Sequence, residues 1–329
     1  MKLSIVFAGA AACVACASAA PLPPTAALPR AAAQGTAVRS ASTPRARVSY
    51  SDAPTLFAAA PGRQIAYRSV GQGPPLLLCN RFRGTVDDWD PAFIDRLAEQ
   101  HTVVTFDTSG LGRSGGPPPT SIAVMAGDVA DLADALHYPT VSLVGWSLGG
   151  FVAQTALARF PGRVTSLILI GTGPAGATDF PAEPVFLERA HKPVNDLEDE
   201  TILFFEPISE ASRKAAAASH ERIASRKSDR SVPVPPALWP GLHAAGGEFR
   251  ADKLGVLDTL KRTSIPILVI MGDHDIVFPM GSWYALTRQL PTARLVVFPR
   301  AGHGPQHEYI EESVAAIETF VRTNQQRPD

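Results

Sequence analysis

The chain has 329 residues, of which 45% are hydrophobic and 19% are charged. This balance can fill a hydrophobic core and differs from the polar, highly charged composition of a disordered protein. The formal net charge is −1 and no dense block of basic residues occurs. A nucleic-acid partner is therefore not expected, because such proteins carry a clear basic footprint.

The first 19 residues have the pattern of a secretory signal peptide. Met1 and Lys2 give a short positive start, residues 3–17 are apolar, and Ala17-Ser18-Ala19 offers small residues for cleavage. An uncleaved anchor is the alternative, but the run is shorter than the about 20 apolar residues of a spanning helix. We expect a secreted or periplasmic protein with no stable membrane insertion after cleavage. Residues 20–48, rich in Ala, Pro and Ser, are expected to form a flexible leader.

From residue 49 to residue 329, short apolar runs alternate with longer amphipathic stretches, as expected of one α/β domain. Apolar residues at consecutive positions indicate strands that are buried on both faces, and hence a doubly wound, mostly parallel sheet. Catalytic residues of such a sheet gather at the carboxyl ends of its strands. The pattern predicts strands over 64–68, 75–79, 103–106, 141–145, 164–170, 267–271 and 295–298, and helices over 91–99, 122–136, 148–160, 280–290 and 311–322.

The alternation is interrupted between about residues 174 and 261. Helical patterns occur around 183–190, 197–205 and 211–226, followed by a Pro-rich turn at 231–240. A structureless loop of this length is improbable inside a compact domain. We predict a helical insertion that forms a lid over the sheet edge.

Gly145-Trp146-Ser147-Leu148-Gly149 lies between a predicted strand and a predicted helix. In this context G-x-S-x-G indicates a nucleophilic serine on a sharp turn, with glycines where the backbone passes close by. The N–H of Leu148, at the start of the helix, is a candidate donor to an oxyanion. A structural serine in a glycine-rich turn is the alternative.

A serine hydroxyl needs a neighbouring base, which a carboxylate in turn orients. In this type of fold the chain order is serine, acid, histidine. Asp273 and Asp275 follow the predicted strand 267–271, and His303 follows the strand 295–298. Ser147 and His303 are therefore the candidate nucleophile and base, with either aspartate as the third member.

Residues from about 64 to 322 resemble the α/β-hydrolase superfamily, especially its small esterases, enol-lactonases and cofactor-free haloperoxidases. The resemblance rests on the motifs above, on Gly302-His303, and on G-x-x-D-x-x-x-P, which ends at Pro279 and selects Asp275 over Asp273. It also includes D-x-x-G-x-G-x-S at residues 107–114, which we interpret as a structural loop.

The chain departs from the family pattern after the strand 75–79. Relatives typically have His-Gly-x there, whereas this chain has Asn80-Arg81-Phe82. Counting back from Trp89 aligns Phe82 with the family's second oxyanion donor, and Asn80 is expected to hydrogen-bond loop backbone. Arg81 either points to solvent or brings positive charge to the mouth of the site and favours an acidic substrate.

The resemblance implies a serine hydrolase that cleaves a small carboxylic ester or lactone through an acyl-enzyme. Perhydrolysis with halide oxidation and cleavage of carbon–carbon bonds remain alternatives within the superfamily. A non-catalytic binding protein is an alternative of another class, although such members normally lack part of the triad. No cofactor is implied, and no metal either, because no cluster such as H-E-x-x-H occurs. The oligomeric state is not predicted.

Overall fold

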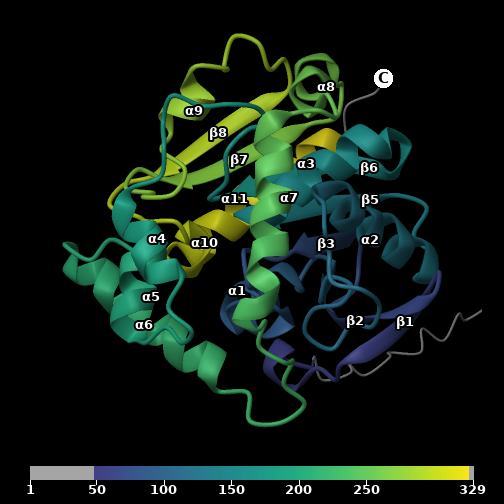
Figure 1. Cartoon of the computed structure of the whole chain (residues 1–329), viewed down its shortest axis with the longest axis horizontal. Coiled ribbons are helices and arrows are strands. Elements are labelled where there is room, and N and C mark those ends of the chain that lie inside the picture. The colour runs from purple at the N-terminus through teal and green to yellow at the C-terminus, as the bar shows by residue number, and fades with distance from the viewer. Residues whose placement is uncertain (1–47, 326–329) are drawn as a thin grey trace, which may run out of the picture. The chain divides into compact units, whose positions relative to one another are not determined.

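The structure, a computed structural model, describes residues 48–325. Its centre is a sheet with the strand order β1-β2-β4-β3-β5-β6-β7-β8 (Figure 1). β2 pairs antiparallel with β1 and β4, and all other neighbours are parallel. The predicted mostly parallel sheet is confirmed. The strands are β1 (Leu56–Ala60), β2 (Arg63–Val70), β3 (Pro75–Cys79), β4 (Thr102–Phe106), β5 (Val141–Trp146), β6 (Val164–Ile170), β7 (Ile267–Gly272) and β8 (Ala293–Phe298).

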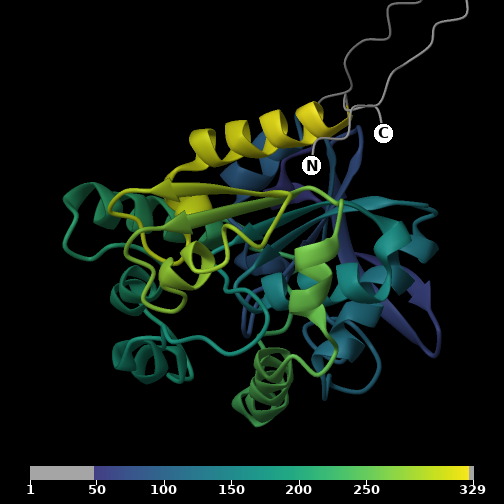
Figure 2. The same ribbon diagram turned by 90° about the horizontal axis from the view of Figure 1, so that it is seen from above.

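Helices cover both faces of the sheet. Figure 2 shows α11 (Ile310–Gln325, yellow) along one side, where α1 (Pro91–Leu97) also packs. The opposite face is covered by α2 (Ile122–Ala135), α3 (Leu148–Arg159) and α8 (Val256–Arg262). All residues of β5 and β7 are buried. Since a fully buried Leu, Ile or Val side chain contributes about 1.5–3 kcal/mol, this two-sided burial fixes the sheet firmly.

The segment between β6 and β7 folds into helices. Three of them were predicted: α4 (Pro184–Ala190), α5 (Leu197–Phe204) and α6 (Glu210–Ala224). α7 (Trp239–Ala251) and α8 were not. α7 was missed because its first turn overlaps a Pro-rich stretch and its middle contains glycines. Proline is tolerated in a first helical turn, and burial of Leu242, Ala245 and Phe249 stabilises the rest. Short helices complete the chain: η1 (Tyr50–Asp52), η2 (Val86–Asp88), η3 (Pro161–Arg163), η4 (Pro236–Leu238), α9 (Gly281–Tyr284) and α10 (Pro305–Glu308).

One expectation about local structure was wrong, and one strand was missed. The helix predicted over 280–290 is limited to α9, and the following residues form turns. There the N–H of Leu286 bonds to the carbonyl of Trp283, three residues earlier, so the chain tightens instead of continuing an α-helix. β1 was not predicted, because its alanines have low strand propensity and its burial does not alternate. It forms by antiparallel pairing with β2.

The predicted signal peptide and almost all of the predicted leader, residues 1–47, lie outside the described residues. Within residues 48–325, no helix has both the length and the apolar character that crossing a membrane requires.

Candidate active site

The sheet brings the three predicted triad residues to one edge. Ser147 directly follows β5, Asp275 lies three residues after β7, and His303 follows β8. These strands run parallel, so their carboxyl ends lie side by side.

Ser147 occupies a strained turn between β5 and α3. Its φ of 57° and ψ of −122° are disfavoured for any residue with a Cβ atom. The backbone N–H of Ser147 donates to the carbonyl of Ile170 at 3.0 Å and holds the turn. A Cβ atom on Gly145 would lie 2.4 Å from the carbonyl oxygen of Gly149, and one on Gly149 would lie 2.0 Å from that of Cys79. The glycines of the motif therefore allow this close backbone approach.

His303 is paired with Asp275. Its Nδ1 lies 3.0 Å from Oδ2 and 3.1 Å from Oδ1 of the carboxylate. Asp275 Oδ1 also accepts the backbone N–H groups of Val277 at 2.8 Å and Phe278 at 3.0 Å. Both members of the pair are buried, with 2% of His303 and 5% of Asp275 exposed. The carboxylate is thus fixed from one side by backbone and faces the imidazole with the other.

Asp273, the alternative acid, does not contact His303. Its carboxylate pairs with the exposed ring of His274, and this hydrogen bond raises the pKa of His274. Of the two aspartates, only Asp275 can orient the ring of His303 in this geometry.

The backbone and ring of His303 are held by their neighbours. Trp146 Nε1 donates to the His303 carbonyl at 2.9 Å, and the rings of Phe204 and Phe278 lie with centroids 6.2 and 5.5 Å from the imidazole. A Cβ atom on Gly171, which has a φ of +49°, would lie 2.3 Å from the His303 carbonyl oxygen. The imidazole therefore has little freedom to leave the pocket.

The two predicted oxyanion donors come from facing segments. Leu148 is the first residue of α3, so its N–H has no partner within the helix. Phe82 lies in the loop after β3, which Gly149 allows to approach α3 closely. Asn80 fixes this loop, as its Nδ2 donates to the carbonyl of Phe106 at 2.7 Å and its Oδ1 accepts Trp89 Nε1 at 2.5 Å. Asn80 thus bonds to backbone, but at the end of β4 and not within the loop as expected.

Ser147 and His303 line one small pocket. Phe82 reaches it from the loop after β3, and the helical insertion covers it with α4 and α5. Its other lining residues are Arg81, Arg83, Phe186, Ala190, Asn195, Leu203 and Phe204.

A family model described as alpha/beta hydrolase fold matches residues 74–308. The chain belongs to this family. An alpha/beta hydrolase fold protein from Chitinophaga pinensis superposes with a TM-score of 0.72 at 29% identity, covering 83% of this chain and 99% of that one. A thermophilic esterase from Thermogutta terrifontis superposes with a TM-score of 0.63 at 25% identity, covering 83% of this chain and 99% of that one. A pimeloyl-[acyl-carrier protein] methyl ester esterase of Nitrosomonas europaea is 27% identical, over 78% of this chain and 99% of its own length.

In this α/β hydrolase, the turn at Ser147 is also supported by Thr172, a residue that the sequence analysis did not single out. Thr172 Oγ1 donates to the Ser147 carbonyl at 2.8 Å, and Trp283 Nε1 donates to the Thr172 carbonyl at 2.7 Å. The only available sign was the position of Thr172 just after β6, at the carboxyl edge where chemistry is expected.

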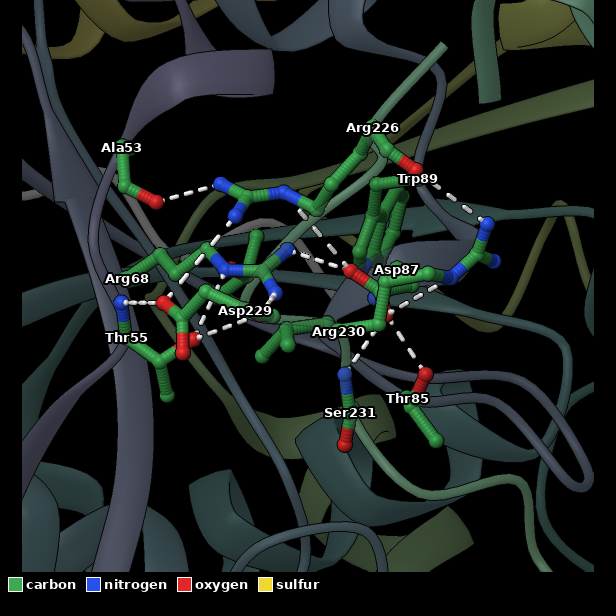
Figure 3. Close-up of polar contacts among 12 residues, drawn as sticks. Ala53, Thr55, Arg68, Thr85, Asp87, Trp89, Arg226, Asp229, Arg230 and Ser231 are labelled. Atoms are coloured by element: carbon green, nitrogen blue, oxygen red, sulfur yellow. Dashed lines mark hydrogen bonds and ion pairs between the residues drawn. The ribbon is translucent and has the colours of Figure 1, made fainter. Parts of the chain in front are cut away.

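An ion-pair cluster around Asp87 joins the helical insertion to the loop after β3 (Figure 3). Arg68 Nη1 lies 2.6 Å from Asp87 Oδ1, and the side chain of Arg68 is fully buried. Arg226 and Arg230 have nitrogens 3.9 and 3.7 Å from the same carboxylate. The N–H of Ser231 donates to Asp87 Oδ2 at 2.7 Å. The chain that leaves α6 is therefore fixed close to the pocket.

Proposed function

We propose that this α/β hydrolase is a serine hydrolase that cleaves a carboxylic ester or a lactone through an acyl-enzyme. The observation that carries the proposal is the buried pair of His303 and Asp275, whose histidine lines the same pocket as Ser147 on its strained turn. The names of relatives support an ester substrate, since one is a methyl ester esterase and another an esterase.

In the proposed reaction, the hydroxyl of Ser147 attacks the substrate carbonyl while His303 takes its proton. Asp275 keeps the Nδ1–H tautomer of His303 and stabilises the imidazolium. The N–H groups of Phe82 and Leu148 hold the negative charge that develops on the carbonyl oxygen, and such donors act strongly where water is excluded. His303 then protonates the leaving alcohol. Water, activated by the same histidine, attacks the acyl-enzyme and releases the acid.

α4 and α5 support this mechanism as a cover. Phe186, Leu203 and Phe204 close the pocket with apolar side chains. Exclusion of water strengthens the charge interactions on the transition state. We infer that the helical insertion acts as the lid expected from the sequence.

The purified mature chain should hydrolyse methyl and p-nitrophenyl esters of short acids, or a simple lactone, and Ser147→Ala should abolish this activity. Parallel assays with acetic acid plus peroxide and with a vinylogous diketone test the alternative reactions. Turnover of the diketone with no ester hydrolysis would assign the chain to carbon–carbon hydrolases instead. Unchanged activity in Ser147→Ala would end the proposal.

Export remains a proposal that rests on the sequence of the first 19 residues. Mass spectrometry of material recovered outside the cytoplasm should find Ala20 as the first residue. Protein that retains Met1 and stays in the cytoplasm would contradict it.

A further inference from the structure

Two arginines flank the candidate oxyanion residue. Arg81 and Arg83 stand on either side of Phe82, and both line the pocket that contains Ser147 and His303. Most arginines near the surface of a protein are paired with a carboxylate or solvated, so the partners of these two decide what they do.

Arg81 has one carboxylate partner and one buried nitrogen without an acceptor among the described residues. Its Nη2 lies 2.5 Å from Asp88 Oδ1, and its Nη1 donates to the carbonyl of Phe82 at 2.9 Å. Its guanidinium stacks over Phe204 and Trp146, at 4.9 and 5.5 Å from the ring centroids. Arg81 Nε is buried and has no hydrogen-bond partner among the described residues. A buried N–H of a cation without an acceptor is costly unless a ligand supplies one.

Arg83 has no carboxylate within ion-pair distance in the part of the chain that the structure describes. Its guanidinium donates to the carbonyls of Ala190 at 2.8 Å, Lys192 at 2.7 Å and Pro193 at 3.3 Å, and lies 4.4 Å from the ring centroid of Trp239. These contacts fix its position but cancel none of its charge. Burial lowers the pKa of Arg83, and the charge of Arg81 lowers it further.

The backbone of Arg83 also carries a cost. Its φ is +61°, a region that glycine and asparagine enter more readily than arginine. Strained backbone positions of this kind cluster at ligand sites, where the surrounding structure holds the residue in the conformation that the site requires.

The neighbouring carboxylates are already engaged. Asp88 Oδ2 accepts the backbone N–H and the hydroxyl of Thr85, at 2.7 and 2.9 Å. Asp87 is held by Arg68, Arg226 and Arg230 (Figure 3). Asp88 is therefore the carboxylate that pairs with Arg81, none pairs with Arg83 among the described residues, and the pocket wall beside Phe82 keeps an excess positive charge.

We propose that Arg81 and Arg83 form an anion subsite, and that the substrate is an ester or lactone that carries a carboxylate. Arginine suits this role because its planar fork of N–H donors matches a carboxylate. The inference rests on the proposed ester or lactone hydrolysis and narrows it to acidic substrates.

Matched esters test the subsite on either side of the scissile bond. The first pair compares monomethyl adipate, which carries a carboxylate on the acyl side, with the uncharged methyl heptanoate. A second pair places the charge on the alcohol side: the butyrate ester of 4-hydroxyphenylacetate is compared with the butyrate ester of 4-ethylphenol. The two leaving groups of this pair are similar. In one of the two pairs we expect kcat/KM to favour the charged ester by about 10-fold or more, the usual contribution of charge-assisted hydrogen bonds. The preference should fall as salt rises from low to about 0.5 M, because salt screens the attraction.

Variants separate the subsite from general charge. Arg83→Gln should lower the ratio of the two kcat/KM values about 10- to 100-fold, and Arg83→Lys should retain part of the preference. The double variant Arg81→Gln/Asp88→Asn removes both members of the ion pair between Arg81 and Asp88. It should also lower the ratio of the two kcat/KM values. Arg262→Gln is the control, since it removes an arginine whose side chain is 75% exposed and outside the pocket. It should leave the ratio unchanged.

The outcomes for the subsite and for the enzyme are distinguishable. If neutral esters are cleaved at least as well as charged ones and Arg83→Gln leaves the ratio unchanged, the subsite is wrong but ester hydrolysis stands. If no ester or lactone is cleaved, the proposed function fails and the inference with it. A direct reading comes from calorimetry on Ser147→Ala. This variant should bind the preferred charged ester, and binding should weaken about 10-fold or more when Arg83→Gln is added. Equal binding by both proteins would overturn the subsite.

Discussion

Ser147 and His303 face Phe82 and Arg83 across the same pocket, but different interactions hold the two sides in place. Around Ser147 and His303, the side of the proposed nucleophile, backbone groups and aromatic rings fix the side chains, as where Asp275 accepts the N–H groups of Val277 and Phe278. On the side of the loop after β3, charged side chains make the contacts, as between Arg81 and Asp88. In the proposed reaction, backbone therefore fixes the geometry of attack, whereas the charged loop selects the substrate.

The largest effect should come from breaking the orientation of His303. Asp275→Asn would favour the wrong tautomer and remove the charge that stabilises the imidazolium, so we expect kcat to fall by at least about 10²-fold. Asp273→Asn is the matched control and should cost far less, since Asp273 pairs with the exposed His274. Ester hydrolysis is the measurement, with circular dichroism to verify folding. An active Asp275→Asn beside an inactive, folded Asp273→Asn would require a different triad.

The pH dependence of the free energy of unfolding tests the burial of His307 against Trp146. His307 lies against Trp146, and burial lowers its pKa to about 4. In the unfolded chain a histidine has a pKa of about 6.5. As pH falls from 6.5 to 4, the unfolded chain therefore binds a proton that the folded protein does not. The free energy of unfolding should decrease through this window, by at most about 3 kcal/mol, and level off below it.

Urea unfolding at several pH values between 7 and 4 measures this decrease. His307→Gln, which keeps a polar group facing the N–H of Asp90, should flatten the curve. His137→Asn, at an exposed position, is the control and should leave the slope unaltered. A steep decrease that persists in His307→Gln would mean that another group governs the acid sensitivity.

Asn80 fixes the loop after β3 to the end of β4, and its removal should have an intermediate effect. Asn80→Ala leaves the buried Trp89 Nε1 and the carbonyl of Phe106 without their partners, which should cost about 2 kcal/mol of stability. Because the loop also carries Phe82, kcat/KM should fall about 10-fold. Thr287→Ala is the control, as it loses a single exposed bond to the carbonyl of Tyr284 and lies outside the pocket. Equal thermal stability of the two variants would show that Asn80 does not fix the loop.

The smallest expected effect concerns strain at Ser147. With a φ of 57° and a ψ of −122°, the position suits glycine better than alanine. Ser147→Gly should therefore be about 1 kcal/mol more stable than Ser147→Ala, after allowance for the greater freedom of glycine in the unfolded chain. Chemical denaturation of both inactive variants gives the difference. A more stable alanine variant would mean that the turn is relaxed.

The nucleophile side could be predicted because its determinants are local. Ser147 needs glycines around it, and Asp275 and His303 need only to follow strands that meet at one edge. Phe82 could be aligned from Trp89, and the bond from Trp89 to Asn80 shows why this tryptophan fixes the loop's register. The partners of Arg83 could not be predicted, since its carbonyl acceptors lie more than 100 residues further along the chain. α7 was also missed because its stability depends on contacts with distant parts of the chain. This tertiary burial outweighs the unfavourable helix propensity of its proline and glycines.

The central claim is that Ser147 is an activated nucleophile, and labelling by a fluorophosphonate probe tests it most directly. Such probes react with a serine that has a base and an oxyanion hole beside it. Peptide mass spectrometry should place the adduct on Ser147 in the folded protein, and His303→Ala should label much more slowly. Labelling at another residue, or labelling of Ser147 that is equally fast without His303, would contradict the account.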